Sequence, residues 1–559
     1  MSRLLKIKFS IRSSLHSQQA LALGGFVLLL ITSLGFRMYR LNTYSLWLDE
    51  TIQYHVATLP LKQMLCRLPY DWLVLPVLIT KLQILTNLDG DAWQLRLPYV
   101  FFGTATVLAI FLLAREMFST RVAWLTAFLA AIWPRLIEYS QEMRPYALFV
   151  LLASTSGFAL LRALRTNQTR YWSLFAAAAT IELYVHHLAL LNVFSFFLFA
   201  LVSICFGYVQ SRYQRVAVSG ATSSDLSLVT KVTTAFLAIG VGFLSVLQFY
   251  LIPLSQEERR GILKLNWKTF EVLGFYLSRE TGRVLIILVV LAVIGLVIAC
   301  RDRKCTAVFA LLWIFVPLFF ATQHFGGERV LGSPRYLLFF IPVLLPFIAA
   351  GAIAIGERIV LLPGLKGSAS EGGVVTKAAL VLTYLILAAL VTPALISLYR
   401  HNPKPLPVDL RSAYAYLLAH AKRTDVILGA GETNRWITSW FPSTDGYFFR
   451  SKVAARRLEI IPVRAEPRPP QPGAFPFQTV DGATGKLFGM IVTDRNEQSK
   501  LRRAAGDAFV CSCWEEVCVV ESTSKLARSV RLDDFLKRFE FVDPENFNAL
   551  VRMHNTEHD

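Results

Sequence analysis

Residues 97–137 read LPYVFFGTATVLAIFLLAREMFSTRVAWLTAFLAAIWPRLI and consist of two long apolar stretches with a short basic turn between them. A helix needs about 20 apolar residues to cross a membrane. The stretches 97–114 and 122–137 come close to that length, and the turn between them carries Arg115 and Arg121. Because lysine and arginine accumulate in cytoplasmic loops, we expect two membrane helices joined on the cytoplasmic side.

The same alternation of apolar stretches and short connectors runs through most of the chain. The further apolar stretches are residues 20–36, 145–161, 171–186, 188–208, 232–252, 284–300, 306–321, 336–355 and 377–398. The sequence therefore predicts a mainly α, polytopic membrane protein with about eleven transmembrane helices.

The basic residues also predict the orientation in the plasma (inner) membrane. Four of them precede the first helix, which favours a cytoplasmic N-terminus, and no small-residue cleavage site follows that helix. Residues 72–85 are apolar but few, and Lys81 interrupts them, so we expect a helix lying at the outer interface. We thus expect a cytoplasmic N-terminus (1–19), a membrane domain (20–399, with a first outer loop 37–96) and an extracytoplasmic domain (400–559).

The composition agrees with this fold class. Of 559 residues, 54% are hydrophobic and only 17% are charged, whereas a soluble domain carries about a quarter of charged residues. Disordered chains, disulfide-rich mini-proteins and coiled coils are excluded. The net charge of +19 fits basic cytoplasmic loops, and no basic stripe with interleaved aromatic residues indicates a nucleic-acid partner.

The polar tail is expected to form a small α/β domain. Residues 425–428 and 487–492 are typical of strands, residues 499–505 of a helix, and residues 509–520 of a strand pair. The Gly/Ser run 367–373 and the proline-rich stretch 467–476 are expected to be loops.

Three of the seven cysteines, Cys511, Cys513 and Cys518, lie in this tail without a zinc-binding spacing. In an extracytoplasmic domain two of them would pair and one would be left over, and the sequence leaves the pairing open.

One predicted outer connector is unusually basic. Residues 253–283 hold six lysines or arginines, among them Arg279, and four glutamates. Either this connector faces an anionic ligand or lipid, or the topology shifts there.

Two acidic clusters fall on the predicted outer side. Asp49 and Glu50 follow an apolar run, and Glu142 and Arg144 lie within EYSQEMRPY, residues 138–146. Each has a structural explanation, as a helix cap or as an ion pair beside the next helix. Their common side of the membrane favours a functional explanation, because two carboxylates and an arginine together are able to deprotonate a hydroxyl and hold a phosphate.

Two further sites lie at predicted outer helix ends. His186 and His187 are candidates for a metal or phosphate ligand, although adjacent helical residues point about 100° apart, which disfavours both on one ion. Arg335, in the run Ser333-Pro334-Arg335-Tyr336, either snorkels to the interface or binds a lipid phosphate.

Several of these motifs together resemble a known family. SLWLDE (45–50), QLRLP (94–98) and YSQEMRPYA (139–147), with the later PRYL (334–337), resemble the GT-C glycosyltransferases of the protein O-mannosyltransferase and aminoarabinose-transferase superfamily. The resemblance covers the membrane part and hardly the tail. It implies a GT-C fold for residues 20–399 and transfer of a sugar from a polyprenyl-phosphate donor to an acceptor hydroxyl at the outer face.

The resemblance also implies roles for single residues. Asp49 is expected to be the general base and Glu142 the second catalytic residue, which positions acceptor or donor directly or through a divalent metal ion. Arg144 and Arg335 are expected to bind the donor phosphate. The other expected substrate-binding residues are Glu50, Asp71, Arg96, Tyr139, Tyr146 and His187.

The sequence departs from the family at one point. Relatives often have His-Pro-Pro where this chain has Pro69-Tyr70-Asp71-Trp72, so that Asp71 offers a carboxylate in place of a histidine. Metal dependence, the sugar and the acceptor (lipid, glycan or protein) therefore stay open.

The alternatives to a glycosyltransferase are a polytopic transporter or lipid flippase and a non-catalytic assembly protein. A transporter or lipid flippase calls for charged or broken segments near the bilayer midplane, whereas the acids here cluster at helix ends. A non-catalytic cell-envelope assembly protein would bind its partner through the tail and would tolerate the loss of the carboxylates.

Overall fold

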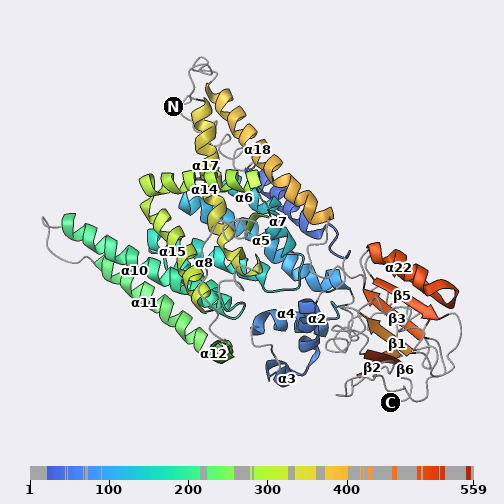
Figure 1. Cartoon of the computed structure of the whole chain (residues 1–559). Helices are drawn as coiled ribbons and strands as arrows, with labels where there is room; N and C mark the ends of the chain where they lie inside the picture. The colour runs from blue at the N-terminus through green and yellow to red at the C-terminus, as the bar shows by residue number, and fades with distance from the viewer. Residues whose placement is uncertain are drawn as a thin grey trace, which may run out of the picture. The chain divides into compact units, whose positions relative to one another are not determined.

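The computed structural model describes residues 20, 22–43, 46, 48–66, 68, 73–89, 91–214, 223–256, 277–279, 282–324, 334–360, 372–400, 416, 420, 426–430, 456–462, 487–492, 495–514, 517–522 and 549–555. The chain forms two compact units (Figure 1). The first comprises Met1–Tyr39, Leu68–Pro76 and Arg96–His401, and the second Arg40–Arg67, Val77–Leu95 and Asn402–Asp559.

The first unit is helical, with a helix at each predicted apolar stretch. The helices are Ala22–Met38, α5 (Ala92–Met117, from Arg96 on), α6 (Thr120–Ile132), α7 (Pro134–Glu138), α8 (Tyr146–Thr166), α9 (Thr169–Leu183), α10 (Ala189–Gln214), α11 (Ser223–Leu244), α12 (Leu247–Gln256), α14 (Gly282–Asp302), α15 (Lys304–His324), the 3-10 helix η2 (Pro334–Phe340), α17 (Ile341–Val360) and α18 (Gly372–Arg400). Within the described part of the chain, seven helices are long and apolar enough to cross a membrane, and shorter apolar helices accompany them. The predicted fold class is thereby confirmed.

The predicted span 122–137 is not one continuous helix. α6 ends at Ile132, Trp133 has an extended backbone with φ −69° and ψ 118°, and α7 starts at Pro134. Proline lacks an N–H group and disfavours the helical conformation of the residue before it, which explains the break.

Helices α14 and α17 contact each other backbone to backbone. A Cβ atom on Gly295 of α14 would lie 2.1 Å from the carbonyl oxygen of Phe347, and one on Gly351 of α17 would lie 2.0 Å from that of Leu291. Small residues at such a contact are typical of helix packing in membranes.

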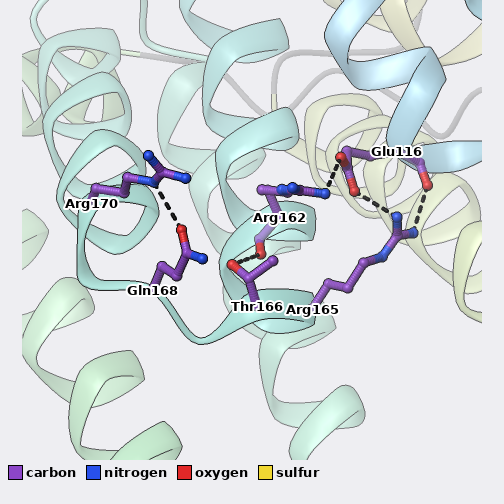
Figure 2. A network of polar contacts seen from close by, with 6 residues as sticks. All are labelled: Glu116, Arg162, Arg165, Thr166, Gln168 and Arg170. Atoms are coloured by element: carbon purple, nitrogen blue, oxygen red, sulfur yellow. Dashed lines mark hydrogen bonds and ion pairs between the residues drawn. The ribbon is translucent and has the colours of Figure 1, made fainter. Parts of the chain in front are cut away.

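A polar network joins the end of α5 to the end of α8 (Figure 2). The buried Glu116 forms ion pairs with Arg162 at 3.1 Å and with Arg165 at 2.7 Å. Arg165 also donates to the backbone carbonyl of Glu116 at 2.8 Å, and Arg170 in the first turn of α9 donates to Gln168 at 2.8 Å. Since helix C-termini leave carbonyl groups without partners, Arg162 and Arg165 stabilise the end of α5.

The second unit contains the short helices of the predicted first outer loop: α2 (Leu48–Thr58), α3 (Leu61–Cys66) and α4 (Val74–Leu85, from Val77 on). The 12 residues of α4 extend about 18 Å, less than the roughly 30 Å of a hydrocarbon core. Lys81 donates to the carbonyl groups of Ala57 and Leu59 at 3.2 and 2.7 Å, so its ammonium group stabilises the C-terminal end of α2. The length of α4 agrees with the prediction of a helix that does not cross.

The second unit also contains a six-stranded mixed sheet in the order β2-β6-β1-β3-β5-β4. Its elements are β1 (Val426–Ala430), β2 (Arg456–Pro462), β3 (Leu487–Val492), α22 (Arg495–Ala505), β4 (Phe509–Trp514), β5 (Val517–Ser522) and β6 (Ala549–Asn555). β1 and β3 are parallel, whereas the other neighbours are antiparallel. The predicted strands, helix and strand pair are confirmed, and β2 and β6 were not predicted.

A disulfide answers the question that the sequence left open. Cys513 and Cys518 are bonded to each other at directly opposite positions of β4 and β5, and Cys511 keeps a free thiol. Burial raises the pKa of the Cys511 thiol above its ordinary value. Among the other predicted features, Asp71, the proline-rich stretch 467–476 and residues 367–371 lie outside the described residues. The end of the predicted loop 367–373 was wrong, because Gly372 and Gly373 begin helix α18.

Candidate functional site

The segment between α7 and α8 is buried although it is a loop. Ser140, Glu142 and Arg144 expose only 1%, 4% and 5% of their surface. Charged residues are rarely this buried unless they pair or bind something. The segment that carries the second acidic cluster is therefore the first candidate site.

An aromatic–arginine cluster, defined as Tyr139, Arg144, Tyr146, His186, Arg335 and Tyr336, surrounds this segment. The ring of Tyr146 lies 5.4 Å from that of Tyr139 and 5.7 Å from that of His186. His186 in turn lies 5.9 Å from Tyr336. The cluster thus joins the start of α8, the turn after α9 and the start of η2.

The two arginines of the cluster lie over its tyrosine rings. The guanidinium carbon of Arg144 is 5.9 Å from the ring centre of Tyr146, and that of Arg335 is 5.6 Å from the ring centre of Tyr336. Cation–π contacts of this kind help to hold a guanidinium group in place. Four predicted site residues, Tyr139, Arg144, Tyr146 and Arg335, therefore meet in one cluster.

The phenol of Tyr139 is a hydrogen-bond donor in this cluster. Burial, and secondarily the neighbouring carboxylates of Glu138 and Glu142, raise the pKa of Tyr139 well above its ordinary value. The hydroxyl therefore stays protonated at any physiological pH.

The adjacent histidines have different surroundings. His186 stacks on Phe149 with 4.9 Å between ring centres. His187, the predicted substrate-binding residue, has its Nε2 atom 3.0 Å from the carbonyl oxygen of Phe249, and its ring contacts Tyr250. The structure thus brings His186, rather than His187, into the aromatic–arginine cluster.

A second group of charges lies one helical turn earlier. The carboxylate of Glu138 accepts from Arg135 at 2.8 Å and pairs with Arg279 at 3.5 Å, and all three side chains are 5–11% exposed. The sequence analysis did not select these residues as site residues. The surplus of basic residues in the connector 253–283 was the signal that pointed to Arg279.

An apolar cavity of about 270 Å³ is lined by sequence neighbours of this ion triad. Trp133 and Ser278, which line it, are close in sequence to Arg135 and Arg279, and the indole N–H of Trp133 donates to the carbonyl of Leu277 at 2.8 Å. Apolar side chains of α14, α15 and α17, with Phe340 at the end of η2, form the remaining wall. The cavity has the polarity of a lipid chain, and the ion triad contains two guanidinium groups.

Asp49 and Glu50 lie in the second unit, in the first turn of α2. Glu50 is fully buried and Asp49 is half-buried. Further along α2, Tyr54 donates to the carboxylate of Asp89 at 2.8 Å and Gln53 donates to Thr80 at 2.9 Å. These bonds fix α2 within the folded outer loop, so Asp49 is presented by a rigid element.

Arg96 is 2% exposed on α5. Around Glu138 and Glu142 the described residues contain no group of three candidate metal ligands, and their one such group is the cysteine trio, of which two form the disulfide. Because Cys513 and Cys518 are joined in a disulfide, this trio does not offer a site for a catalytic divalent ion.

One segment of the chain matches a known protein family. Residues 76–218 match the family model described as dolichyl-phosphate-mannose-protein mannosyltransferase. No curated protein matches the chain by sequence.

Solved structures with a similar arrangement share little sequence with this chain. The archaeal oligosaccharyltransferase AglB from Archaeoglobus fulgidus, in complex with an inhibitory peptide and a dolichol-phosphate, is 12% identical over 72% of this chain, with a TM-score of 0.46. This chain spans only 58% of that protein's length. The same oligosaccharyltransferase in complex with Zn and sulfate is 13% identical over 73% of this chain and 56% of its own, with a TM-score of 0.40.

ArnT from Cupriavidus metallidurans, bound to undecaprenyl phosphate, is 14% identical over 89% of this chain and 98% of its own length, with a TM-score of 0.48. The family match at residues 76–218 includes the buried loop 138–146, whose motif carried the predicted resemblance. Over residues 76–218, which include this loop, the chain is thus similar to the family of dolichyl-phosphate-mannose-protein mannosyltransferases.

Proposed function

We propose that this protein transfers a sugar from a polyprenyl-phosphate donor to an acceptor hydroxyl at the outer face of the membrane. The observation that carries the proposal is the apolar cavity of about 270 Å³, whose lining residues Trp133 and Ser278 are close in sequence to the largely buried Arg135 and Arg279. A polyprenyl phosphate has the same division into an apolar chain and an anionic head. The family match at residues 76–218 supports the same donor class.

The proposed chemistry follows from the charges involved. The bond between the sugar and the donor phosphate breaks, a bond forms between the anomeric carbon and the acceptor oxygen, and Asp49 takes the hydroxyl proton. Negative charge grows on the departing lipid phosphate, and preorganised guanidinium groups in a site without water stabilise that charge most strongly. We assign this role to Arg144, Arg335 and Arg279.

Glu142 and the tyrosines have supporting roles in this proposal. The buried carboxylate of Glu142 lies on the same loop as Arg144 and is suited to orient an acceptor or sugar hydroxyl. The protonated phenol of Tyr139 is suited to donate a hydrogen bond to the donor. His187, Glu50, Asp71 and Arg96 stay predicted substrate-binding residues.

The test uses the purified protein in lipid nanodiscs with defined polyprenyl-phosphate sugars. We expect release of the free lipid phosphate, and we expect Asp49→Asn to lower that release at least about a hundredfold, as for loss of a general base. The matched control is Asp91→Asn, because Asp91 lies outside α2 and before α5. Unchanged release by Asp49→Asn would remove the assignment of the base, and transbilayer movement of the lipid without release would indicate a flippase instead.

A further inference from the structure

Arg37 lies near the end of the first helix, Ala22–Met38, and is fully buried. Burying a guanidinium group is costly unless its N–H groups find partners. Here Nη1 donates to the hydroxyl and the carbonyl of Ser33 at 2.6 and 3.1 Å, so part of the guanidinium is bound within its own helix. The other partners come from distant parts of the chain.

The first distant partner is the broken end of α6. Nη2 of Arg37 donates to the carbonyl of Ala130 at 3.3 Å, and Nη1 donates to that of Ala131 at 3.2 Å. In a continuous helix the carbonyl of Ala130 would accept from the N–H four residues later, but that residue is Pro134, which has none. Arg37 supplies the missing donor, and its charge suits a helix C-terminus.

The second distant partner is the buried loop. Nε of Arg37 donates to the hydroxyl of Ser140 at 3.3 Å. In return, the side-chain amide of Gln141 donates to the carbonyl groups of Arg37 and Tyr39 at 3.0 and 2.8 Å. Arg37 is thus bonded to the two residues that immediately precede Glu142.

Helix α5 leaves the space for this arrangement. A Cβ atom on Gly103 would lie 1.9 Å from the hydroxyl oxygen of Ser140 and 3.0 Å from Nε of Arg37. A side chain at this position of α5 would therefore displace both groups.

We propose that Arg37 is a positioning residue: its guanidinium group joins the broken end of α6 to Ser140 and thereby fixes the loop that carries Glu142 and Arg144. The proposal concerns the geometry of that loop and holds whichever substrate it binds. Its consequence for sugar transfer rests on the proposed function.

The test measures hydrogen–deuterium exchange of the full-length protein in nanodiscs. In Arg37→Met we expect the backbone amides of Tyr139, Ser140 and Gln141, which are bonded back into α7, to exchange faster by about tenfold or more, because buried acceptors lose their donor. Peptides from α14 and α17 should keep their wild-type rates, which separates loss of positioning from loss of the fold. The control is Thr32→Val, on an exposed position of the same helix.

Two further variants make the outcome decisive. Ser140→Ala removes one contact with little change in volume and should raise exchange at the same amides, so it replaces Arg37→Met if that variant does not fold. Arg37→Lys keeps the charge but cannot span both partners with its ammonium group, and should give an intermediate rate. Wild-type exchange at these amides in Arg37→Met would overturn the proposal, and so would full rescue by Arg37→Lys. If Arg37→Met does not fold, wild-type exchange in Ser140→Ala would overturn it.

The transfer assay then separates the positioning role of Arg37 from the proposed sugar transfer. Transfer should fall in the same order as loop protection, from wild type through Arg37→Lys to Arg37→Met. A protein that shows the exchange effect but no transfer in any form would retain the positioning role and refute the proposed function.

Discussion

Arg279 is the residue whose role is tested most directly by substitution. It directly follows Ser278 of the cavity lining, shares Glu138 with Arg135 and has a left-handed backbone with φ 64°. Arg279→Gln keeps a polar side chain but shortens it and removes the charge. We expect the KM for the lipid donor to rise about tenfold to a hundredfold, the usual cost of one charge-assisted hydrogen bond.

The matched control for this prediction is Arg283→Gln, at an exposed position shortly after Arg279 in the chain. Steady-state release of lipid phosphate at varied donor concentration is the measurement. An equal change in KM for both variants would mean that general positive charge, rather than the guanidinium group of Arg279, attracts the donor.

At the scale of residues, the sequence predicted the charged segment of the candidate site, but it did not predict which of two adjacent side chains lies in the cluster. The motif of residues 138–146 identified Glu142 and Arg144, and the structure buries both. It could not separate His186 from His187, because that difference depends on contacts with Phe149 and Tyr250, which come from other helices. The ion pair of Arg279 with Glu138 joins residues 141 positions apart, and no local pattern contains it.

At the scale of elements, the contact between α14 and α17 is the one to perturb. Gly351→Ala places a methyl group where only 2.0 Å separates it from the carbonyl oxygen of Leu291. Overpacking of this kind costs about 1–3 kcal/mol, so we expect a lower unfolding temperature. Since both helices line the cavity, donor binding should weaken as well.

Gly240→Ala on α11 is the control, because a Cβ atom there meets nothing within 4 Å. It should leave the unfolding temperature unchanged or raise it slightly, since alanine is favoured over glycine within a helix by about 0.5–1 kcal/mol. Thermal unfolding followed by tryptophan fluorescence provides the measurement. Equal stability of Gly351→Ala and wild type would show that the two helices separate without cost.

The elements themselves were largely predictable, because long apolar stretches leave few alternatives to a helix in a membrane. The break at Trp133 could have been predicted from Pro134 but was not. Strands β2 and β6 were missed for another reason. β2 begins with the polar run Arg456-Arg457-Leu458-Glu459, and its partner β6 lies about a hundred residues further along the chain.

At the scale of the whole molecule, the predicted topology is tested by cysteines that the chain already contains. Cys66 is exposed in the predicted first outer loop, and Cys305 is exposed at the start of α15, next to a predicted cytoplasmic connector. In variants that keep only one of the two, we expect a membrane-impermeant maleimide to label Cys66 in intact cells. Cys305 should react only after the membrane is permeabilised.

Labelling of both residues from the same side would contradict the predicted number of crossings between them. It would also contradict the common outer side of the two acidic clusters, because that inference depends on residues 72–85 not crossing. The sequence predicts this topology from its charges, and the arrangement of helices alone does not orient it.

The disulfide has a consequence beyond the single molecule. Among the described strands, β4 lies at one of the two edges of the sheet, and edge strands offer backbone groups on which a second chain can add its own strand. The bond between Cys513 and Cys518 ties this strand covalently to β5, so that it resists peeling away. Samples kept in reducing buffers should therefore form aggregates by strand exchange sooner than oxidised ones.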